Sequence, residues 1–246
     1  MTASTKILGV IPARYESTRF PGKPLALLKG KAMIRWVYEG ASDVFDQLVV
    51  ATDDERILHA VHDFGGQAVM TSKDHRSGTE RCAEALELVE KNLRVEFSHI
   101  VNIQGDEPLV SDKQLKELIA CLSRPGTEVA TLVAPFEPDE DPSSRHLVKV
   151  VVNQKAEALY FSRALIPYPA KAEHQPEYLK HIGLYGFSSS ALRKISKLPT
   201  SQLELSESLE QLRWLDHGMV IRTAQTSHRS VGVDTPEELE HLNAIL

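Results

Sequence analysis

The chain has 246 residues, a net charge of −6 and 42% hydrophobic residues, which indicates a globular protein with room for one α/β domain. This acidic balance argues against a protein that binds nucleic acid over its main surface, although a local basic patch remains possible. The chain shows no signal-peptide core and no apolar run near the ~20 residues of a membrane span, so we expect a cytoplasmic protein. Cys82 and Cys121 have no metal-ligand spacing, and we expect free thiols.

Strands and helices are expected to alternate in the first half of the chain. The predicted strands are residues 6–11 (stopped by Pro12), 47–52, 67–70 and 99–103. The predicted helices are residues 32–44, 53–66 (with a capping box from Thr52 to Glu55), 79–91 (opened by Ser77 and Glu80) and one that starts near Ser111. This alternation predicts a parallel, doubly wound sheet. The loops after strands 6–11 and 99–103 should then border one ligand site.

The second half is richer in strands. We predict strands at 128–135, 181–187 and 219–225, a hairpin over 146–162 that turns at residues 153–155, one helix over 206–217, and a last helix over 234–246 with Thr235 as N-cap. The sequence contains no linker that would cut the chain into two independent domains.

A basic loop follows the first strand. Five basic residues and one acid lie between Pro12 and Lys31, in a protein that is acidic as a whole. Arg14, Arg19 and Lys23 could bind a polyphosphate, or the long side chains could simply be solvated. No Gly-rich phosphate loop of a familiar type is present.

Two acidic positions could hold Mg²⁺. Asp106 follows the strand at 99–103, where a carboxylate could bind the metal against phosphates or could instead stabilise a turn. Asp234 precedes the N-cap Thr235, and by pattern alone it interacts with the helix dipole. A metal role for Asp234 requires that it fold back beside Asp106.

Further polar residues could contact a substrate. Arg163 lies at a strand end, and His181 and Tyr185, four apart in a strand, should face the same side. Glu210 and Gln211 share the predicted helix at 206–217. Each of these residues taken singly is more often structural.

Together these stretches resemble the 3-deoxy-manno-octulosonate (Kdo) cytidylyltransferase family, also called CMP-Kdo synthetases. The resemblance spans residues 6–242 and rests on the ordered motifs IPARYESTRFPGKPL, ATDDERI, SGTER, VNIQGDEP, ALYFSR, HIGLYGF, LEQLR and GVDTPEEL. The first loop, together with QGDEP, is highly specific. The local sequence ELSES before LEQLR departs from some relatives, which leaves the pose of the helix bearing Glu210 open.

The resemblance implies the roles of individual residues. Arg14, Lys23 and Asp106 would be catalytic, and Asp106 and Asp234 would ligate Mg²⁺. The remaining implied contacts are Arg14, Arg19, Lys23, Ser77 and Gly78 with the nucleotide, and Gln104, Arg163, His181, Tyr185, Glu210 and Gln211 with Kdo. No general base is implied.

The resemblance also implies the reaction and the architecture. CTP and Kdo would give CMP-Kdo and pyrophosphate for lipopolysaccharide biosynthesis, in a cytoplasmic homodimer. The implied fold is a Rossmann-like nucleotide-diphospho-sugar transferase, with a mostly parallel central sheet and a β-rich extension for sugar binding and dimerisation. Within one domain over 1–246, residues 1–130 and 215–246 would form the nucleotide-binding core and 131–214 the extension.

Other functions remain to be weighed. A nucleotidyltransferase for another base or another acidic sugar is the nearest alternative, and a catalytically inactive nucleotide-binding module is the second. A Rossmann dehydrogenase is disfavoured because the glycine fingerprint is missing.

Overall fold

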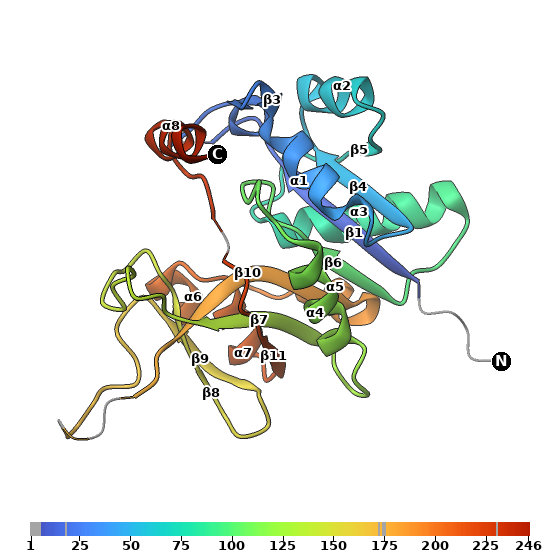
Figure 1. The fold of residues 1–246 in the computed structure, drawn as a ribbon. Coiled ribbons are helices and arrows are strands. Elements are labelled where there is room, and N and C mark those ends of the chain that lie inside the picture. Colours follow the sequence, from blue (N-terminus) through green and yellow to red (C-terminus); the bar gives the residue numbers. More distant parts are fainter. Residues whose placement is uncertain (1–5, 18, 172, 174–175, 230) are drawn as a thin grey trace. The chain divides into compact units, whose positions relative to one another are not determined.

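The structure is a computed structural model that describes residues 6–17, 19–171, 173, 176–229 and 231–246. It contains two compact units, shown with the chain coloured from N- to C-terminus in Figure 1. The first unit comprises Met1–Lys116 and Arg229–Leu246, and the second comprises Glu117–His228. The last segment of the chain therefore belongs to the same unit as the first.

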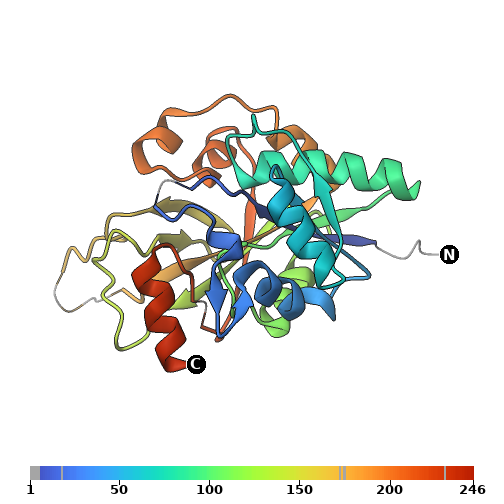
Figure 2. The same cartoon turned by 90° about the horizontal axis from the view of Figure 1, so that it is seen from above.

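The first unit is built on four parallel strands. They are β1 (Ile7–Ala13), β4 (Gln47–Thr52), β5 (Ala68–Met70) and β6 (His99–Asn102), and they pair in the order β6-β1-β4-β5. Three helices connect them: α1 (Met33–Ser42), α2 (Glu55–Asp63) and α3 (Gly78–Leu93). Figure 2 shows α1 and α3 on opposite sides of these strands. The predicted alternation of strands and helices in this half is confirmed.

The prediction that Pro12 ends the first strand is wrong, because β1 continues to Ala13. Pro12 pairs in register with Ala51 of β4. The Val10 carbonyl accepts from Ile103 on the β6 side, and residues 10 and 12 of a strand point to the same side. Because β6 has ended by this point, the missing N–H of Pro12 costs no ladder hydrogen bond.

The capping box predicted from Thr52 to Glu55 is also wrong. The N-cap of α2 is Asp54, whose side chain accepts from the Arg56 backbone N–H. Thr52 belongs to β4, and its hydroxyl accepts from the Asp54 backbone N–H instead. The helix thus begins two residues later than the box would require, with Asp54 in the extended N-cap conformation.

The C-terminal segment packs against the start of the chain. Helix α8 (Pro236–Ile245) has the predicted capping box between Thr235 and Glu238. It lies beside the short hairpin of β2 (Leu27–Leu28) and β3 (Lys31–Ala32), where the Asn243 side chain bonds the Lys29 N–H and the Leu27 carbonyl. The shared apolar cluster consists of Leu28, Met33, Val233, Leu239 and Leu242. Residues distant in sequence are thereby held together.

The second unit is mostly antiparallel. Its strands are β7 (Val129–Pro135), β8 (Lys149–Val152), β9 (Ala158–Ser162), β10 (Leu179–Ser188) and β11 (Ile221–Gln225). β10 pairs antiparallel with β7 and β8, β8 with β9, and β11 pairs parallel with β7. Helix α4 (Asp112–Leu122) leads into this unit in the chain, and α5 (Ser189–Ile195) follows β10. The predicted strands and hairpin are confirmed, whereas α5 was not predicted.

The single helix predicted over 206–217 is wrong. Two helices stand there, α6 (Gln202–Glu207) and α7 (Gln211–Asp216). Ser208 between them has a left-handed backbone, with φ 52°, and ends α6. The capping box of Ser201 and Glu204 starts a helix earlier than the leucine spacing suggested.

The prediction that both cysteines are free thiols is confirmed, and both are buried. Within the part of the chain that the structure describes, none of the helices has the length and apolar character that a bilayer crossing requires.

Candidate active site

The first unit contains a cavity of about 250 Å³ beyond the ends of β1 and β6. Its lining includes eight residues predicted from the sequence, from four separate segments: Arg14, Arg19, Lys23, Ser77, Gly78, Gln104, Asp106 and Asp234. The expectation that the loops after these two strands border one site is met. The roles of the individual residues stay predictions.

Two glycines allow the segments around the cavity to approach one another. A Cβ on Gly105 would lie 2.9 Å from the Pro12 carbonyl oxygen, which is closer than real side chains come to backbone. A Cβ on Gly78 would lie 3.2 Å from the Pro12 ring. The loop after β6 and the start of α3 can therefore both pack against the end of β1.

The basic loop has its own internal support. The Gly22 N–H donates to the Tyr15 carbonyl at 2.8 Å, and Gly22 adopts a left-handed conformation with φ 75°. The Tyr15 ring lies against Gly22, and the Arg56 guanidinium stacks 3.3 Å from the centroid of that ring. The 3-10 helix η1 (Lys23–Leu25) follows directly, so the closed loop delivers Lys23 to the cavity.

Lys23 joins the two acidic positions. Its Nζ donates to Asp106 Oδ2 at 2.7 Å, to Asp234 Oδ1 at 3.1 Å and to the Val233 carbonyl at 3.0 Å. Arg19 Nη1 lies 3.0 Å from Asp234 Oδ2. The Lys23 side chain is only 13% exposed, so these bonds use its three donors in a partly desolvated place. Asp234 does fold back beside Asp106, as a metal role for Asp234 requires.

Backbone pairing explains this convergence. The Val233 N–H donates to the Asp106 carbonyl at 2.9 Å, which ties the segment before α8 to the loop after β6. The packing of α8 against β2 and β3 holds the same segment from the other end. Asp234 is thus positioned by contacts about 130 residues away in sequence, at Asp106, and about 210 away, at Lys23.

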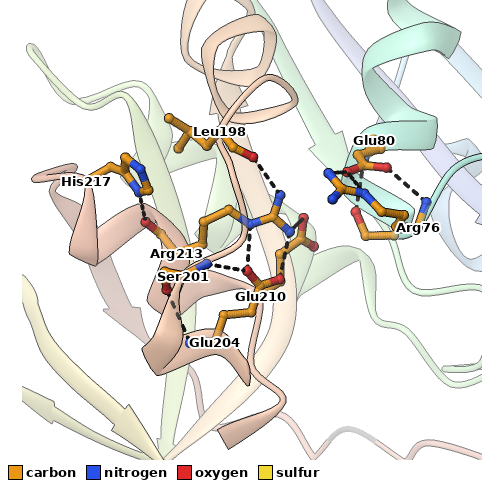
Figure 3. Close-up of polar contacts among 9 residues, drawn as sticks. Arg76, Glu80, Leu198, Ser201, Glu204, Glu210, Arg213 and His217 are labelled. Atoms are coloured by element: carbon orange, nitrogen blue, oxygen red, sulfur yellow. Dashed lines mark hydrogen bonds and ion pairs between the residues drawn. The ribbon is translucent and has the colours of Figure 1, made fainter. Parts of the chain in front are cut away.

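The start of α3 is braced by its own first turn. Ser77 is the N-cap, as predicted, and its hydroxyl accepts from the Glu80 N–H at 3.2 Å. The Glu80 carboxylate accepts from the Arg76 backbone N–H at 2.9 Å and from the Arg76 guanidinium at 3.0 and 2.6 Å. Figure 3 shows this pair. The residue before the predicted nucleotide residue Ser77 is therefore held by the first turn of the helix.

In the second unit, His181 and Tyr185 do share one side of β10. Their ring centroids lie 5.2 Å apart, although a bulge between Ile182 and Tyr185 shifts the register against β7. Burial lowers the pKa of His181 to about 3. Burial, and then the negative charge of Glu210, raise the pKa of Tyr185 well above its ordinary value. Both rings are therefore neutral near pH 7.

Thr131 of β7 anchors this histidine. Its Oγ1 lies 3.1 Å from His181 Nε2 and 2.8 Å from the Leu184 carbonyl oxygen. If the hydroxyl donates to the carbonyl, Oγ1 accepts from Nε2–H, which assigns the tautomer of His181. Phe161, Phe187 and Trp214 complete the aromatic surroundings.

Arg163 follows β9, as predicted, and its guanidinium is held by backbone carbonyls. Nε donates to Glu207 at 2.8 Å, Nη1 to Arg145 at 3.0 Å and Nη2 to Ser208 at 3.5 Å. The Glu207 carboxylate in turn accepts from the Ser162 hydroxyl at 2.6 Å and from the Arg163 N–H at 2.9 Å. Three of the five N–H groups of the Arg163 guanidinium are thus used in contacts within the second unit.

Glu210 and Gln211 lie at the start of α7, after the break that the sequence did not reveal. Glu210 Oε1 lies 3.4 Å from Arg213 Nη2, and Gln211 is 5% exposed. Figure 3 shows the stronger partner of Arg213, the Glu204 carboxylate, at 2.9 and 2.7 Å. The pose of Glu210 is therefore set through Arg213 by the preceding helix α6.

Three residues that support these sites were not singled out from the sequence. They are Asp53, Arg81 and Glu207. The first two lie inside the motifs ATDDERI and SGTER, and a signal was present there: charged residues at positions that precede or open a helix against the sheet.

Comparison with known proteins identifies the family. The family model described as "Cytidylyltransferase" matches residues 8–221. A 3-deoxy-manno-octulosonate cytidylyltransferase from Parabacteroides distasonis is 49% identical, with 98% of each chain covered, and one from Porphyromonas gingivalis is 46% identical, covering 99% of this chain and 97% of its own. A solved CMP:2-keto-3-deoxy-manno-octonic acid synthetase in complex with CTP matches with a TM-score of 0.90 and 44% identity, covering 98% of each chain.

A more distant structure shows the fold alone. The 4-diphosphocytidyl-2C-methyl-D-erythritol synthase from Anaerococcus prevotii has a TM-score of 0.61 at 11% identity, covering 97% of this chain and 95% of its own. The predicted fold class, a Rossmann-like α/β nucleotidyltransferase, is thereby confirmed together with the family suggested by the motifs. The chain belongs to the 3-deoxy-manno-octulosonate cytidylyltransferase family.

Proposed function

We propose that this chain transfers CMP from CTP to the anomeric hydroxyl of Kdo and releases pyrophosphate. The observation that carries the proposal is the meeting of Lys23, Asp106 and Asp234 in one cavity, in a chain that belongs to this family. Cations for a triphosphate and carboxylates for a divalent metal lie within hydrogen-bond distance of each other there.

The basic residues of the cavity would bind the phosphates. Nucleotidyl transfer builds negative charge on the α-phosphate oxygens and on the departing pyrophosphate, and fixed cations stabilise both. Arg14 and Arg19 line the cavity, and the Arg19 side chain is 64% exposed, so a ligand can replace its ion pair with Asp234 at low cost. Lys23 would exchange its contact with a carboxylate for one with a phosphate. Ser77 and Gly78 would contact the cytidine.

The acidic residues fit a magnesium ion. Asp106 and Asp234 both place a carboxylate oxygen near the Lys23 ammonium, so one cation already lies between them. Carboxylate oxygens are the ligands that Mg²⁺ prefers, and it commonly takes one or two of them together with phosphates and water. Mg²⁺ bound there would supply charge neutralisation for the phosphates and lower the pKa of a coordinated hydroxyl. Asp106 and Asp234 are the residues that would hold it.

No protein nucleophile is required, because the acceptor is a hydroxyl of the sugar itself. Both cysteines are buried, and burial raises the pKa of the Cys121 thiol, which makes that residue a poor nucleophile. Arg163, His181, Tyr185, Glu210 and Gln211 would contact Kdo, as would Gln104. Arg163 is suited to the Kdo carboxylate because a guanidinium pairs with it in two parallel hydrogen bonds.

The biological setting follows from the substrates. CMP-Kdo would serve lipopolysaccharide biosynthesis, and CTP is a cytoplasmic nucleotide, so we place the enzyme in the cytoplasm. We further propose a homodimer, with residues 131–214 as sugar-binding and dimerisation extension and residues 1–130 and 215–246 as nucleotide-binding core.

The test is pyrophosphate release with Mg²⁺ and each of CTP, UTP, ATP and GTP, with and without Kdo. Release with CTP and Kdo together, and not with either alone, is expected. Release with another nucleotide would replace this function by a related nucleotidyl transfer, as would release with CTP and another acidic sugar in place of Kdo. Binding of CTP without release under any condition would indicate an inactive nucleotide-binding module.

A further inference from the structure

An ion pair with little solvent exposure lies beside the cavity, and one of its members, Arg81, lines the cavity. Arg81 of α3 and Asp53, directly after β4, have side chains that are 4% and 15% exposed. Arg81 Nη2 donates to Asp53 Oδ2 at 2.7 Å. Breaking such a buried pair leaves an uncompensated charge away from water, so the two residues should act as one unit.

The same guanidinium holds the loop between β5 and α3. Arg81 Nη1 donates to Thr71 Oγ1 at 2.5 Å and to the Ser72 carbonyl at 3.3 Å. Arg81 therefore ties three segments together: the end of β4, the loop at 71–77 and the first turn of α3. Both of its terminal nitrogens, Nη1 and Nη2, donate to protein groups, so Arg81 acts on the loop more than on a ligand.

A second residue of α3 supports the loop. The Glu84 carboxylate accepts from the Ser72 backbone N–H at 2.8 Å and pairs closely with His75. His75 also lines the cavity. Since Glu84 lies one turn beyond Arg81, one face of the helix fixes the loop at more than one point.

This loop runs directly into the predicted nucleotide contacts. It ends at Ser77 and Gly78, which cap and open α3 and line the cavity. A loop between elements gains a fixed geometry only when other groups hold it, and a preformed site avoids the entropic cost of ordering the loop when the ligand binds.

We propose that Arg81, held by Asp53, is a positioning residue for CTP. It fixes the loop at 71–77 so that Ser77 and Gly78 are in place before the nucleotide arrives. This inference rests on the proposed function, because it takes CTP as the ligand of the cavity. It adds two residues to which the sequence motifs assigned no role.

The test uses Asp53→Asn, Arg81→Lys and the double variant, with Glu140→Gln as the matched control. Glu140 pairs with Lys180 in the second unit, and its side chain is 14% exposed, close to the 15% of Asp53. We measure the CTP dissociation constant by calorimetry with Mg²⁺ and without Kdo, the KM values for both substrates, and the melting temperature of each protein.

We expect each single variant to weaken CTP binding by about tenfold or more, consistent with the loss of a buried charged contact. The KM for Kdo at saturating CTP should change by less than about twofold. The double variant should bind CTP no more weakly than the worse single variant, since the residues act as a pair. Glu140→Gln should lower the melting temperature and leave CTP binding unchanged.

Other outcomes separate the two proposals. Wild-type protein that binds no CTP would overturn both. If the wild-type protein turns over and the Asp53 and Arg81 variants keep the same CTP affinity, the positioning role alone is overturned. Equal increases in the KM values for CTP and Kdo in these variants would also overturn it. If Asp53→Asn does not fold, Thr71→Val removes one Arg81 contact and keeps the ion pair; unchanged CTP affinity in this variant and in Arg81→Lys would overturn the role.

Discussion

The cavity of the first unit and the aromatic cluster of the second unit stabilise polar groups in different ways. Around Lys23 in the cavity, opposite charges face one another with solvent nearby, and the side chains of Asp106 and Asp234 are 34% and 44% exposed. Around His181 and Tyr185, burial among rings keeps both groups neutral. The first arrangement depends on charge and the second on desolvation.

This difference suits the proposed ligands. Partly exposed ion pairs contribute little net stability, so a charged nucleotide can break and replace them at low cost. A buried neutral cluster is rigid and costly to rearrange, which suits a surface that recognises the shape of a sugar. Variants in the two regions should therefore affect activity and stability in different proportions.

The largest effect is expected from Asp106→Asn in the cavity. Loss of the carboxylate should lower pyrophosphate release by a factor on the order of 1000, because Asp106 would hold the Mg²⁺ that neutralises the negative charge developing on the phosphates. Stability should change by about 1 kcal/mol or less, since the Lys23 pair is partly exposed. Retained turnover with Mg²⁺ would refute the metal role of Asp106.

Lys23→Met tests the charge balance in the cavity of the first unit. Without the ammonium, Asp106 and Asp234 repel each other, and we expect the melting temperature in EDTA to fall by roughly 2–4 °C. Added Mg²⁺ should restore it by taking the place between the carboxylates. The control is Lys23→Met with Asp106→Asn, which should show no recovery. If the melting temperature of Lys23→Met does not change when Mg²⁺ is added, that result would argue against a metal site at Asp106 and Asp234.

Arg163→Ala tests the second unit by substrate. We expect the KM for Kdo to rise roughly 10- to 100-fold through loss of a charge-assisted pair, and the KM for CTP to change by less than about threefold. Steady-state kinetics in each substrate measures the split. An equal rise in both values would remove Arg163 from the sugar site and leave it a structural anchor for the Glu207 and Arg145 carbonyls.

His181 gives the second unit a pH dependence. Its pKa is about 3 in the folded protein and near 6.5 when unfolded. The stability from the neutral ring is thus fully present above pH 6.5 and is lost as the pH falls toward 3. The loss can reach on the order of 4 kcal/mol. His181→Gln should weaken the pH dependence of the free energy of unfolding, measured in urea, below pH 6.5. An unchanged pH dependence would assign the titration to another group.

The smallest effect is expected from Ser201→Ala. Ser201 caps α6 with a reciprocal box to Glu204, and α6 carries Glu207, which holds Arg163. Loss of the cap should cost about 1 kcal/mol and change the KM for Kdo by less than about twofold. Thermal melting and kinetics measure both. A large rise in that KM would show that α6 positions the sugar contacts more tightly than its capping bonds suggest.

Local signals in the sequence predicted most elements of both units. Apolar runs marked β4 and β6, and the caps at Ser77 and Thr235 were found because a side chain bonds a backbone N–H only three residues away. Two of the failures have different causes. Pro12 could remain in β1 because its neighbour β6 had ended, and the break at Ser208 depends on a left-handed residue that the leucine spacing does not reveal.

Motif order and patterns within short windows are enough to identify the family, the fold class and the charged residues. Which of these charges meet depends on how the chain folds. Asp234 reaches Lys23 because α8 packs on the β2–β3 hairpin, and Arg81 reaches Asp53 because α3 packs on the sheet beside β4. Contacts between residues far apart in sequence depend on how helices pack against strands, and no local pattern in the chain encodes that packing.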